Sequence, residues 1–428
     1  MRSAVIRHVV RGLGLALGVA ACSKDATGPT TGTLKILSGD QQVALVGYPT
    51  NLRPAVRVLA AGNNPVAGVS VTFAVTAGGG SITGPTSVTT GANGIAQIDG
   101  WTVGSVGGTN TLSAAAAVGG GLVTFTAFGV QPSFNIIIQN VGPPLSAAVQ
   151  TAFNAAVVRW EQIIYEGLPA VANFTAAAGD CGPGTPADGP ETINDIKIMV
   201  LFDSIDGPGK VLGQSGPCYI RNAPDYRTVL GVMRFDTADV AGLVAAGRIN
   251  DVILHEMAHV FGYGSLWAAG AFGCLKLPAT AGTFPDTYYS CARALAEFDT
   301  IGGTSYTGLH KVPLENCAGI TGCGTGTFNA HWRESTFFNE LMTGYLNSGT
   351  SNPLSVLTIA AMGDMGYSVN YGAASPYTRT FSSSVQAAPV SERLVAPAPI
   401  ALGDDIAHIP IRVVDRGGTL MRVIPARR

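Results

Sequence analysis

Residues 249–262 read INDVILHEMAHVFG, and this stretch decides how the second half of the chain folds. Its apolar residues recur on nearly every side of a helical wheel, which predicts a helix that is buried almost all round. His255 and His259 are four positions apart, so they lie one turn apart on the same helical face. Glu256 stands beside that face.

Two histidines and a carboxylate in a buried helix are costly unless a partner compensates them. A zinc ion is the simplest partner, because imidazoles at this spacing can reach one ion at about 2.0–2.1 Å. Glu256 would then take a proton from water without binding the ion. The alternative is a chance pattern with exposed or mutually bonded side chains, which is rare in a chain with 6 histidines.

A catalytic zinc also needs a third protein ligand and an open position for water. The compact arrangement, with a third histidine ten residues after His255, is absent because that position is a serine. Outside the leader, the histidines that remain are His310, His331 and His408. His310 lies beside a lysine and His408 lies in the tail, so ordinary loop positions are favoured for both.

His331 begins the run HWRE, and residues 339–345 read NELMTGY. Together with residues 255–267, these runs resemble the leishmanolysin family of metzincin zinc metalloendopeptidases. The resemblance covers about residues 134–372. It implies that His331 is the third zinc ligand and that Met342 forms the methionine turn beneath the metal. The alternative for Met342 is an ordinary core residue.

The resemblance implies a zinc-dependent endopeptidase with one catalytic ion and a protein or peptide substrate. Zinc would polarise the scissile carbonyl and activate water, with Glu256 as the general base that later protonates the leaving amine. Residues 211–215 are a candidate strand edge for an extended substrate. Leishmanolysins are held latent by a propeptide cysteine, but the only cysteine upstream of this domain is Cys22.

Two alternatives belong to other functional classes. One is a surface adhesin or binding protein whose peptidase-like domain is inactive. The other is a zinc hydrolase acting on bonds other than peptides, although the helix motif fits peptidases best. Zinc content and chelator-sensitive cleavage of an unstructured protein would separate the first alternative from a peptidase.

The amino terminus reads as an export signal. Three arginines within the first eleven residues precede an apolar run at 12–21, which is too short to span a bilayer. The run ends in VAAC at 19–22, which resembles a bacterial lipobox. This implies a lipoprotein signal peptide at 1–21, lipidation of Cys22, a tether at 22–31 and anchoring to a membrane. The alternative is an ordinary signal peptide, so we expect an envelope lipoprotein (outer membrane or cell surface) or a secreted protein.

Residues 32–130 alternate apolar and polar side chains in short runs separated by turn signals, which predicts a β-sandwich. The stretch from Val66 to Gly100 resembles the bacterial immunoglobulin-like domains of invasin-type surface proteins. The resemblance implies a spacer or an adhesive module. The segment has no histidine and no cysteine, so we place no chemistry in it.

Length and composition favour several domains. The chain has 428 residues, 56 glycines and only 12% charged residues, which indicates loop-rich β structure. We expect an all-β immunoglobulin-like sandwich followed by an α+β metzincin-type domain at 132–372 and a tail at 373–428 without an assigned role. The net charge is -2 without a basic block, so nucleic-acid binding is excluded.

Six cysteines besides Cys22 lie in the second half of the chain. An even number in an exported chain predicts up to three disulfides, with fifteen possible connectivities. The short spacing makes a bond between the last two plausible, and the absence of a CxxC pair disfavours a cysteine zinc site. The six are Cys181, Cys218, Cys274, Cys291, Cys317 and Cys323.

We expect reduction of the disulfides to lower zinc affinity as well as stability. Four of the six cysteines lie between Gly262 and His331, where cross-links would hold the long segment that delivers His331. Metal analysis of the oxidised and the reduced protein checks this expectation. Full metal content and activity after complete reduction would contradict it.

Overall fold

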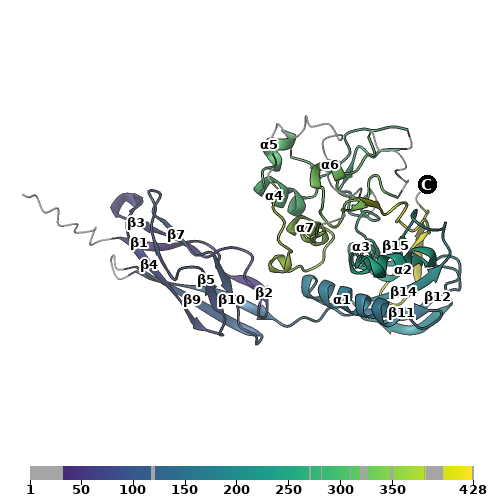
Figure 1. Cartoon of the computed structure of the whole chain (residues 1–428). Coiled ribbons are helices and arrows are strands. Elements are labelled where there is room, and N and C mark those ends of the chain that lie inside the picture. Colours follow the sequence, from purple (N-terminus) through teal and green to yellow (C-terminus); the bar gives the residue numbers. More distant parts are fainter. Residues whose placement is uncertain are drawn as a thin grey trace, which may run out of the picture.

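The structure is a computed structural model. It describes residues 32–116, 121–268, 271–280, 282–308, 310–318, 323, 326–347, 350–379, 381 and 399–426. The expected signal peptide, Cys22 and the tether lie outside these residues. Among the helices of the described part, none has the length and apolar character needed to cross a bilayer. Mostly strands and some helices build the chain (Figure 1).

The amino-terminal unit is built from two main sheets around one core. One sheet has the order β1-β3-β7 and the other β2-β10-β9-β4-β6. Their bounds are β1 Thr33–Ser38, β3 Ala55–Leu59, β7 Ile95–Gln97, β2 Gln42–Leu45, β10 Leu122–Val130, β9 Gly108–Ala116, β4 Ser70–Ala77 and β6 Ser87–Thr89. A small pair, β5 Ser81–Thr83 and β8 Gly100–Thr102, lies beside them.

The alternation read from the sequence explains how this core forms. Along β4, Val71 and Phe73 are buried while Ser70 and Thr72 are exposed. Side chains of both sheets join one apolar cluster, so the unit is a β-sandwich. Phe73 of β4 lies close to Phe125 of β10, with ring centroids 6.4 Å apart.

A six-stranded sheet organises the second unit, in the order β11-β14-β16-β15-β22-β23. The strands β11, β14 and β16 are parallel, β15 is antiparallel to β16, and β22 runs parallel to β15. Their bounds are β11 Ile136–Val141, β14 Ile196–Asp203, β16 Thr228–Asp236, β15 Gly213–Arg221, β22 Ile411–Val414 and β23 Leu420–Ile424.

Strand β14 is buried on both faces, as its continuous apolar sequence predicts. Ile198 and Val200 face the larger core, which contains helices α1 (Ala147–Ile163) and α3 (Ile249–Val260). Met199 and Leu201 face a second cluster, which includes β12 (Val171–Ala176) and β13 (Asp188–Ile193). The helix predicted from residues 249–262 is thus present as α3.

Shorter elements complete the second unit. They are α2 Thr237–Ala245, β17 Leu275–Lys276, β18 Tyr288–Tyr289, α4 Ala292–Thr300, α5 Gly303–Thr307, β19 Val312–Pro313, α6 Glu334–Phe337, β20 Tyr345–Leu346, α7 Val356–Asp364 and β21 Ile400–Ala401. The single-turn 3₁₀ helices are η1 Ala61–Asn63 in the sandwich and η2 Tyr371–Ala373 after α7.

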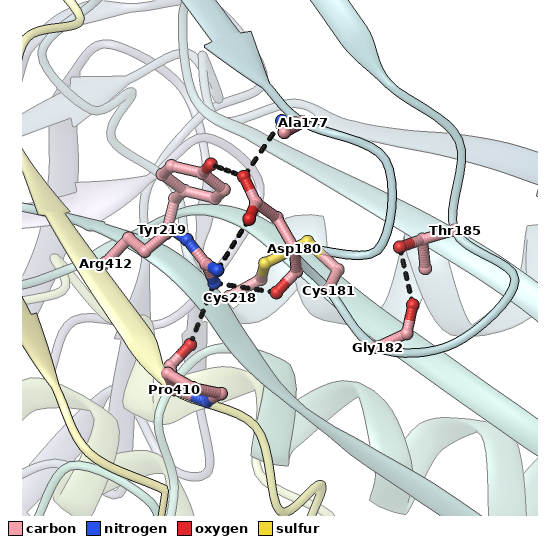
Figure 2. Close-up of a disulfide and its surroundings, with 9 residues drawn as sticks. All are labelled: Ala177, Asp180, Cys181, Gly182, Thr185, Cys218, Tyr219, Pro410 and Arg412. Atoms are coloured by element: carbon pink, nitrogen blue, oxygen red, sulfur yellow. Dashed lines mark hydrogen bonds and ion pairs between the residues drawn. A yellow bond between two sulfur atoms is a disulfide. The ribbon is translucent and has the colours of Figure 1, made fainter.

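The six cysteines of the second half form three disulfides. The pairs are Cys181–Cys218, Cys274–Cys291 and Cys317–Cys323. Figure 2 shows the first of them, which ties the loop after β12 to the middle of β15.

The carboxy-terminal residues join the sheet of the second unit. The tail, to which the sequence assigned no role, contains β22, which pairs with β15 at residues 219–221. Strand β23 then pairs with β22. Strands β22 and β23 of the tail are therefore built into the six-stranded sheet, whereas β21 pairs with β20 in a separate two-stranded sheet.

We predict that Phe125→Ala destabilises the sandwich by about 3–5 kcal/mol, because Phe125 is fully buried in its core. Hydrogen exchange of the β9 and β10 amides in the full-length protein measures this loss. Phe128→Ala on the same strand is the control, since this ring is 51% exposed, and it should change stability by less than about 0.5 kcal/mol. Equal effects of the two substitutions would contradict the burial described here.

Candidate metal centre

Helix α3 carries the first two histidines into the core of the second unit. His255, Glu256 and His259 are all buried on it. The helix ends at Phe261 as its C-cap, and Gly262 follows with φ +105°, a conformation that favours glycine. The turn that follows places the Tyr263 carbonyl 2.9 Å from His259 Nδ1.

The third histidine arrives from far along the chain. His331 is fully buried, and its Nε2 lies 3.1 Å from His255 Nε2 and 3.0 Å from His259 Nε2. The Nε2 atoms of His255 and His259 are 3.0 Å apart. Three ring nitrogens from two distant segments thus converge on one point.

Backbone carbonyls fix the orientation of all three rings. His255 Nδ1 donates to the Leu341 carbonyl at 2.7 Å, and His331 Nδ1 donates to the Thr327 carbonyl at 2.9 Å. His259 Nδ1 donates to Tyr263 in the same way. A neutral histidine that donates from Nδ1 carries its lone pair on Nε2. Three lone pairs therefore face one another, an arrangement that calls for a cation.

Packing between the turn after α3 and the segment around His331 makes this approach possible. A Cβ on Gly264, which has φ +71°, would lie 2.5 Å from the carbonyl oxygen of Ala330. Nearby, the rings of Tyr263, Trp267, Tyr289 and Trp332 pack together, with neighbouring centroids 4.4–5.6 Å apart. This aromatic cluster adjoins His331 directly in the chain and fixes its place.

Glu256 lies against the first residues of β15. The Ser215 hydroxyl is 2.6 Å from Glu256 Oε2 and 2.7 Å from the Glu256 carbonyl oxygen. The other carboxylate oxygen, Oε1, has no hydrogen-bond partner among the described residues. Burial raises the pKa of Glu256 well above its usual range, and repulsion from Asp405 adds to this, while the Ser215 hydrogen bond acts in the opposite direction.

A buried carboxylate shapes the turn that contains Met342. Glu340 accepts hydrogen bonds from the Met342 amide at 2.6 Å, from the Ser355 amide and hydroxyl, and from the Thr358 hydroxyl. This turn presents the Leu341 carbonyl to His255. Met342 itself is fully buried, and its carbonyl accepts from the Trp332 amide at 3.0 Å.

The residue that the sequence interpretation missed is Asp405, in the carboxy-terminal segment. It is fully buried, and its Oδ2 lies 3.0 Å from His331 Nε2, 3.3 Å from His255 Nε2 and 3.9 Å from His259 Nε2. Its Oδ1 has no hydrogen-bond partner among the described residues. Nothing in the sequence distinguishes this aspartate from Asp404, because no spacing relates it to the helix motif.

Charge and burial oppose each other in this cluster. Burial lowers the pKa of His255 and, more strongly, that of His259. Burial also acts to lower the pKa of His331, but Asp405 outweighs it and raises this pKa. For Asp405 burial acts to raise the pKa, and the three histidines outweigh it and hold the pKa below its usual range.

The remaining histidines lie elsewhere. The exposed His310 ring pairs with Asp299 at 2.8 Å, and His408 Nε2 is 2.9 Å from the Asp404 carboxylate. Neither belongs to the group of residues that could hold a metal, which contains His255, His259, His331 and Asp405.

The donor set fits a divalent transition metal. The six separations among the three Nε2 atoms and Asp405 Oδ2 span 3.0–3.9 Å. Such spacing suits nitrogen and oxygen ligands around one ion with bonds of about 2.0–2.2 Å, the values for zinc. A cation would also compensate the unpartnered carboxylate oxygen of Asp405.

The helix motif, the converging histidines and the carboxylate beside them form a candidate metal site. The family model described as leishmanolysin matches residues 187–385. A leishmanolysin domain is therefore present in the chain, and that family consists of zinc metalloendopeptidases. The matched range contains His255, Glu256, His259, His331 and Met342, and it ends before Asp405.

Other comparisons add little. A search of curated proteins finds no match to this chain. Among solved structures, the chain is similar to the Yersinia pseudotuberculosis adhesin InvE, with 21% identity, a TM-score of 0.20 and coverage of 24% of this chain and 32% of that one. The D0-D1 domain of intimin gives 22% identity, a TM-score of 0.20 and coverage of 24% and 50%. The chain thus spans half of these structures or less, and the TM-scores are too low to assign a fold.

We predict that His331→Ala abolishes stoichiometric metal binding, because it removes one of three converging nitrogens. Metal analysis of the purified full-length protein measures this. His310→Ala is the matched control, since this ring is exposed and paired with Asp299 outside the cluster, and it should retain the metal. Equal metal content in the two variants would show that the ion is held elsewhere.

Proposed function

We propose that the chain is an exported, zinc-dependent metalloendopeptidase with His255, His259 and His331 as metal ligands and Glu256 as general base. The observation that carries this proposal is the convergence of three Nε2 atoms within 3.1 Å of one another, with every Nδ1 bonded to a carbonyl. The leishmanolysin domain at 187–385 supports the peptidase chemistry.

In the proposed hydrolysis of a peptide bond, protein side chains handle the proton and position the reacting groups. Zinc, when bound, polarises the scissile carbonyl and makes water more acidic. Glu256 accepts the proton of the attacking water at its carboxylate and returns it to the leaving amine. The Ser215 hydroxyl, 2.6 Å from Oε2, keeps this carboxylate oriented. Met342 lies in the turn that fixes His255, and we assign it a supporting role without direct ligation.

An extended peptide would bind along the edge of β15. The first residues of this strand lie beside Glu256, since a Cβ on Gly213 would be 3.4 Å from the Glu256 carboxylate carbon. One side of β15 pairs with β16, and on the other side β22 pairs with residues 219–221 while Asp405 and Ala407 bond to the backbone of Ser215. A peptide could pair with the start of β15 once residues 405–407 leave this edge. The edge expected at 211–215 therefore corresponds to the start of β15.

Export accounts for the remaining features of the chain. Three disulfides are consistent with an oxidising compartment outside the cytoplasm. Lipidation at Cys22 would tether the protein to the cell envelope, with the sandwich as a spacer between the membrane and the peptidase domain.

We predict that Glu256→Gln retains zinc but lowers kcat by about 10²–10⁴-fold, because it removes the proton acceptor and preserves the shape of the side chain. Glu297→Gln on α4 is the control and should leave turnover unchanged. Turnover of an unstructured protein is measured with and without a chelator, both in the otherwise unaltered protein and together with Asp405→Ala, because the Asp405 carboxylate lies among the three histidines. Substantial chelator-sensitive turnover in the Glu256→Gln protein would remove this residue from the mechanism.

A further inference from the structure

We propose that residues 399–414 are a built-in inhibitory segment, which occupies the strand edge where a substrate would pair and supplies Asp405 as a fourth metal ligand. This inference rests on the proposed function and adds a mode of latency to it. The segment lies beyond the leishmanolysin match at 187–385, so the family resemblance does not supply it.

The position of Asp405 carries the first part of the inference. Its Oδ2 is 3.0–3.9 Å from the three Nε2 atoms, and the side chain is closed off from solvent. A catalytic zinc site keeps its fourth position open for water or substrate, whereas a structural site fills it with a protein ligand. With Asp405 in place, three histidines and one aspartate fill all four positions, as in a structural zinc site.

The backbone on both sides of Asp405 occupies the edge of β15. The Ser215 amide donates to the Asp405 carbonyl at 2.8 Å, and the Ala407 amide donates to the Ser215 carbonyl at 2.9 Å. Both backbone groups of Ser215 are therefore used. An incoming peptide that adds a strand at this edge needs the same groups, so the segment and a substrate exclude each other.

The segment also holds the opposite side of the site. Strand β21 pairs with β20, which follows the turn of Met342, and the Leu402 amide donates to the Gly344 carbonyl at 3.1 Å. The Thr327 hydroxyl donates to the Gly403 carbonyl at 2.6 Å. The segment thus passes from β20 to β15 directly beside the three histidines and contacts both sides of the site.

Further contacts dock the end of the segment firmly. Figure 2 shows Arg412 of β22 beside the Cys181–Cys218 disulfide, where it pairs with the Asp180 carboxylate at 2.5 Å and donates to the Asp180 carbonyl at 2.7 Å. The guanidinium also lies over the Tyr219 ring, 5.6 Å from its centroid. Four apolar side chains of the segment are buried, namely Leu402, Ile406, Val413 and Val414.

The test uses the full-length protein with cobalt(II) in place of zinc, because its visible absorption reports the ligand set. We expect Asp405→Ala to change this absorption and to weaken zinc binding, measured by chelator competition, at least about tenfold. Acetohydroxamate, a small metal-binding probe, should bind this variant at least tenfold more tightly than the unaltered protein. Asp404→Asn is the matched control, and neither the absorption nor zinc affinity should change in it.

A second variant separates docking from ligation. Arg412→Ala keeps all four proposed ligands but removes the contacts with Asp180, so acetohydroxamate should bind it more tightly than the unaltered protein while the cobalt spectrum without the probe stays the same. Unchanged absorption and zinc affinity in Asp405→Ala would overturn the fourth ligand. Unchanged acetohydroxamate binding in both variants would show that the segment does not block access to the metal site.

Peptide hydrolysis at saturating zinc distinguishes the two proposals. If residues 399–414 inhibit the site, Asp405→Ala should raise the turnover of an unstructured substrate at least tenfold. If the unaltered protein already hydrolyses peptides and Asp405→Ala does not raise the rate, the inhibitory role fails and the proposed function stands. If Asp405→Ala changes the cobalt spectrum as expected yet hydrolyses no peptide, the ligand assignment stands and the peptidase function fails.

Discussion

The second unit depends on one constraint, the donation of three imidazole Nδ1 protons to backbone carbonyls. These bonds to Leu341, Tyr263 and Thr327 leave three Nε2 lone pairs facing one another inside the protein. Such an arrangement is unfavourable by itself, because buried lone pairs that face one another repel and have no compensating charge between them. The cluster without a metal therefore lowers the stability of the folded chain, and a bound cation would raise it. Folding and metal binding are therefore coupled here.

The rest of the second unit brings the three histidines and their carbonyl partners together from distant parts of the chain. The Gly264 turn, the aromatic cluster around Trp332 and the Glu340 hydrogen bonds each hold one carbonyl or one ring in place. The Cys274–Cys291 and Cys317–Cys323 bonds lie within the segment between Gly262 and His331. The disulfides and the packed rings reduce the number of conformations open to that segment, so the position of His331 is restricted.

Local spacing in the sequence predicts only what lies on one element. The pair His255 and His259 follows from helical geometry, and β14 follows from an apolar run. His331 lies 72 residues beyond His259, so its assignment needed a family resemblance. Asp405 lies 150 residues from His255 and reaches it through pairing of the tail with β15. Strand pairing at that separation leaves no periodic signal, and therefore neither the residue nor the role of its segment could be predicted.

Ser215 is attached both to Glu256 and to the neighbouring strand, which has a consequence for the proposed peptidase. Its hydroxyl holds the Glu256 carboxylate, while its amide and carbonyl bind whichever strand lies alongside. Ser215 alone thus sets the register of that strand relative to the Glu256 carboxylate. A slip by one position would turn every side chain of that strand to the other face of the sheet. In the proposed peptidase, main-chain geometry would therefore fix which bond of a bound peptide is cleaved.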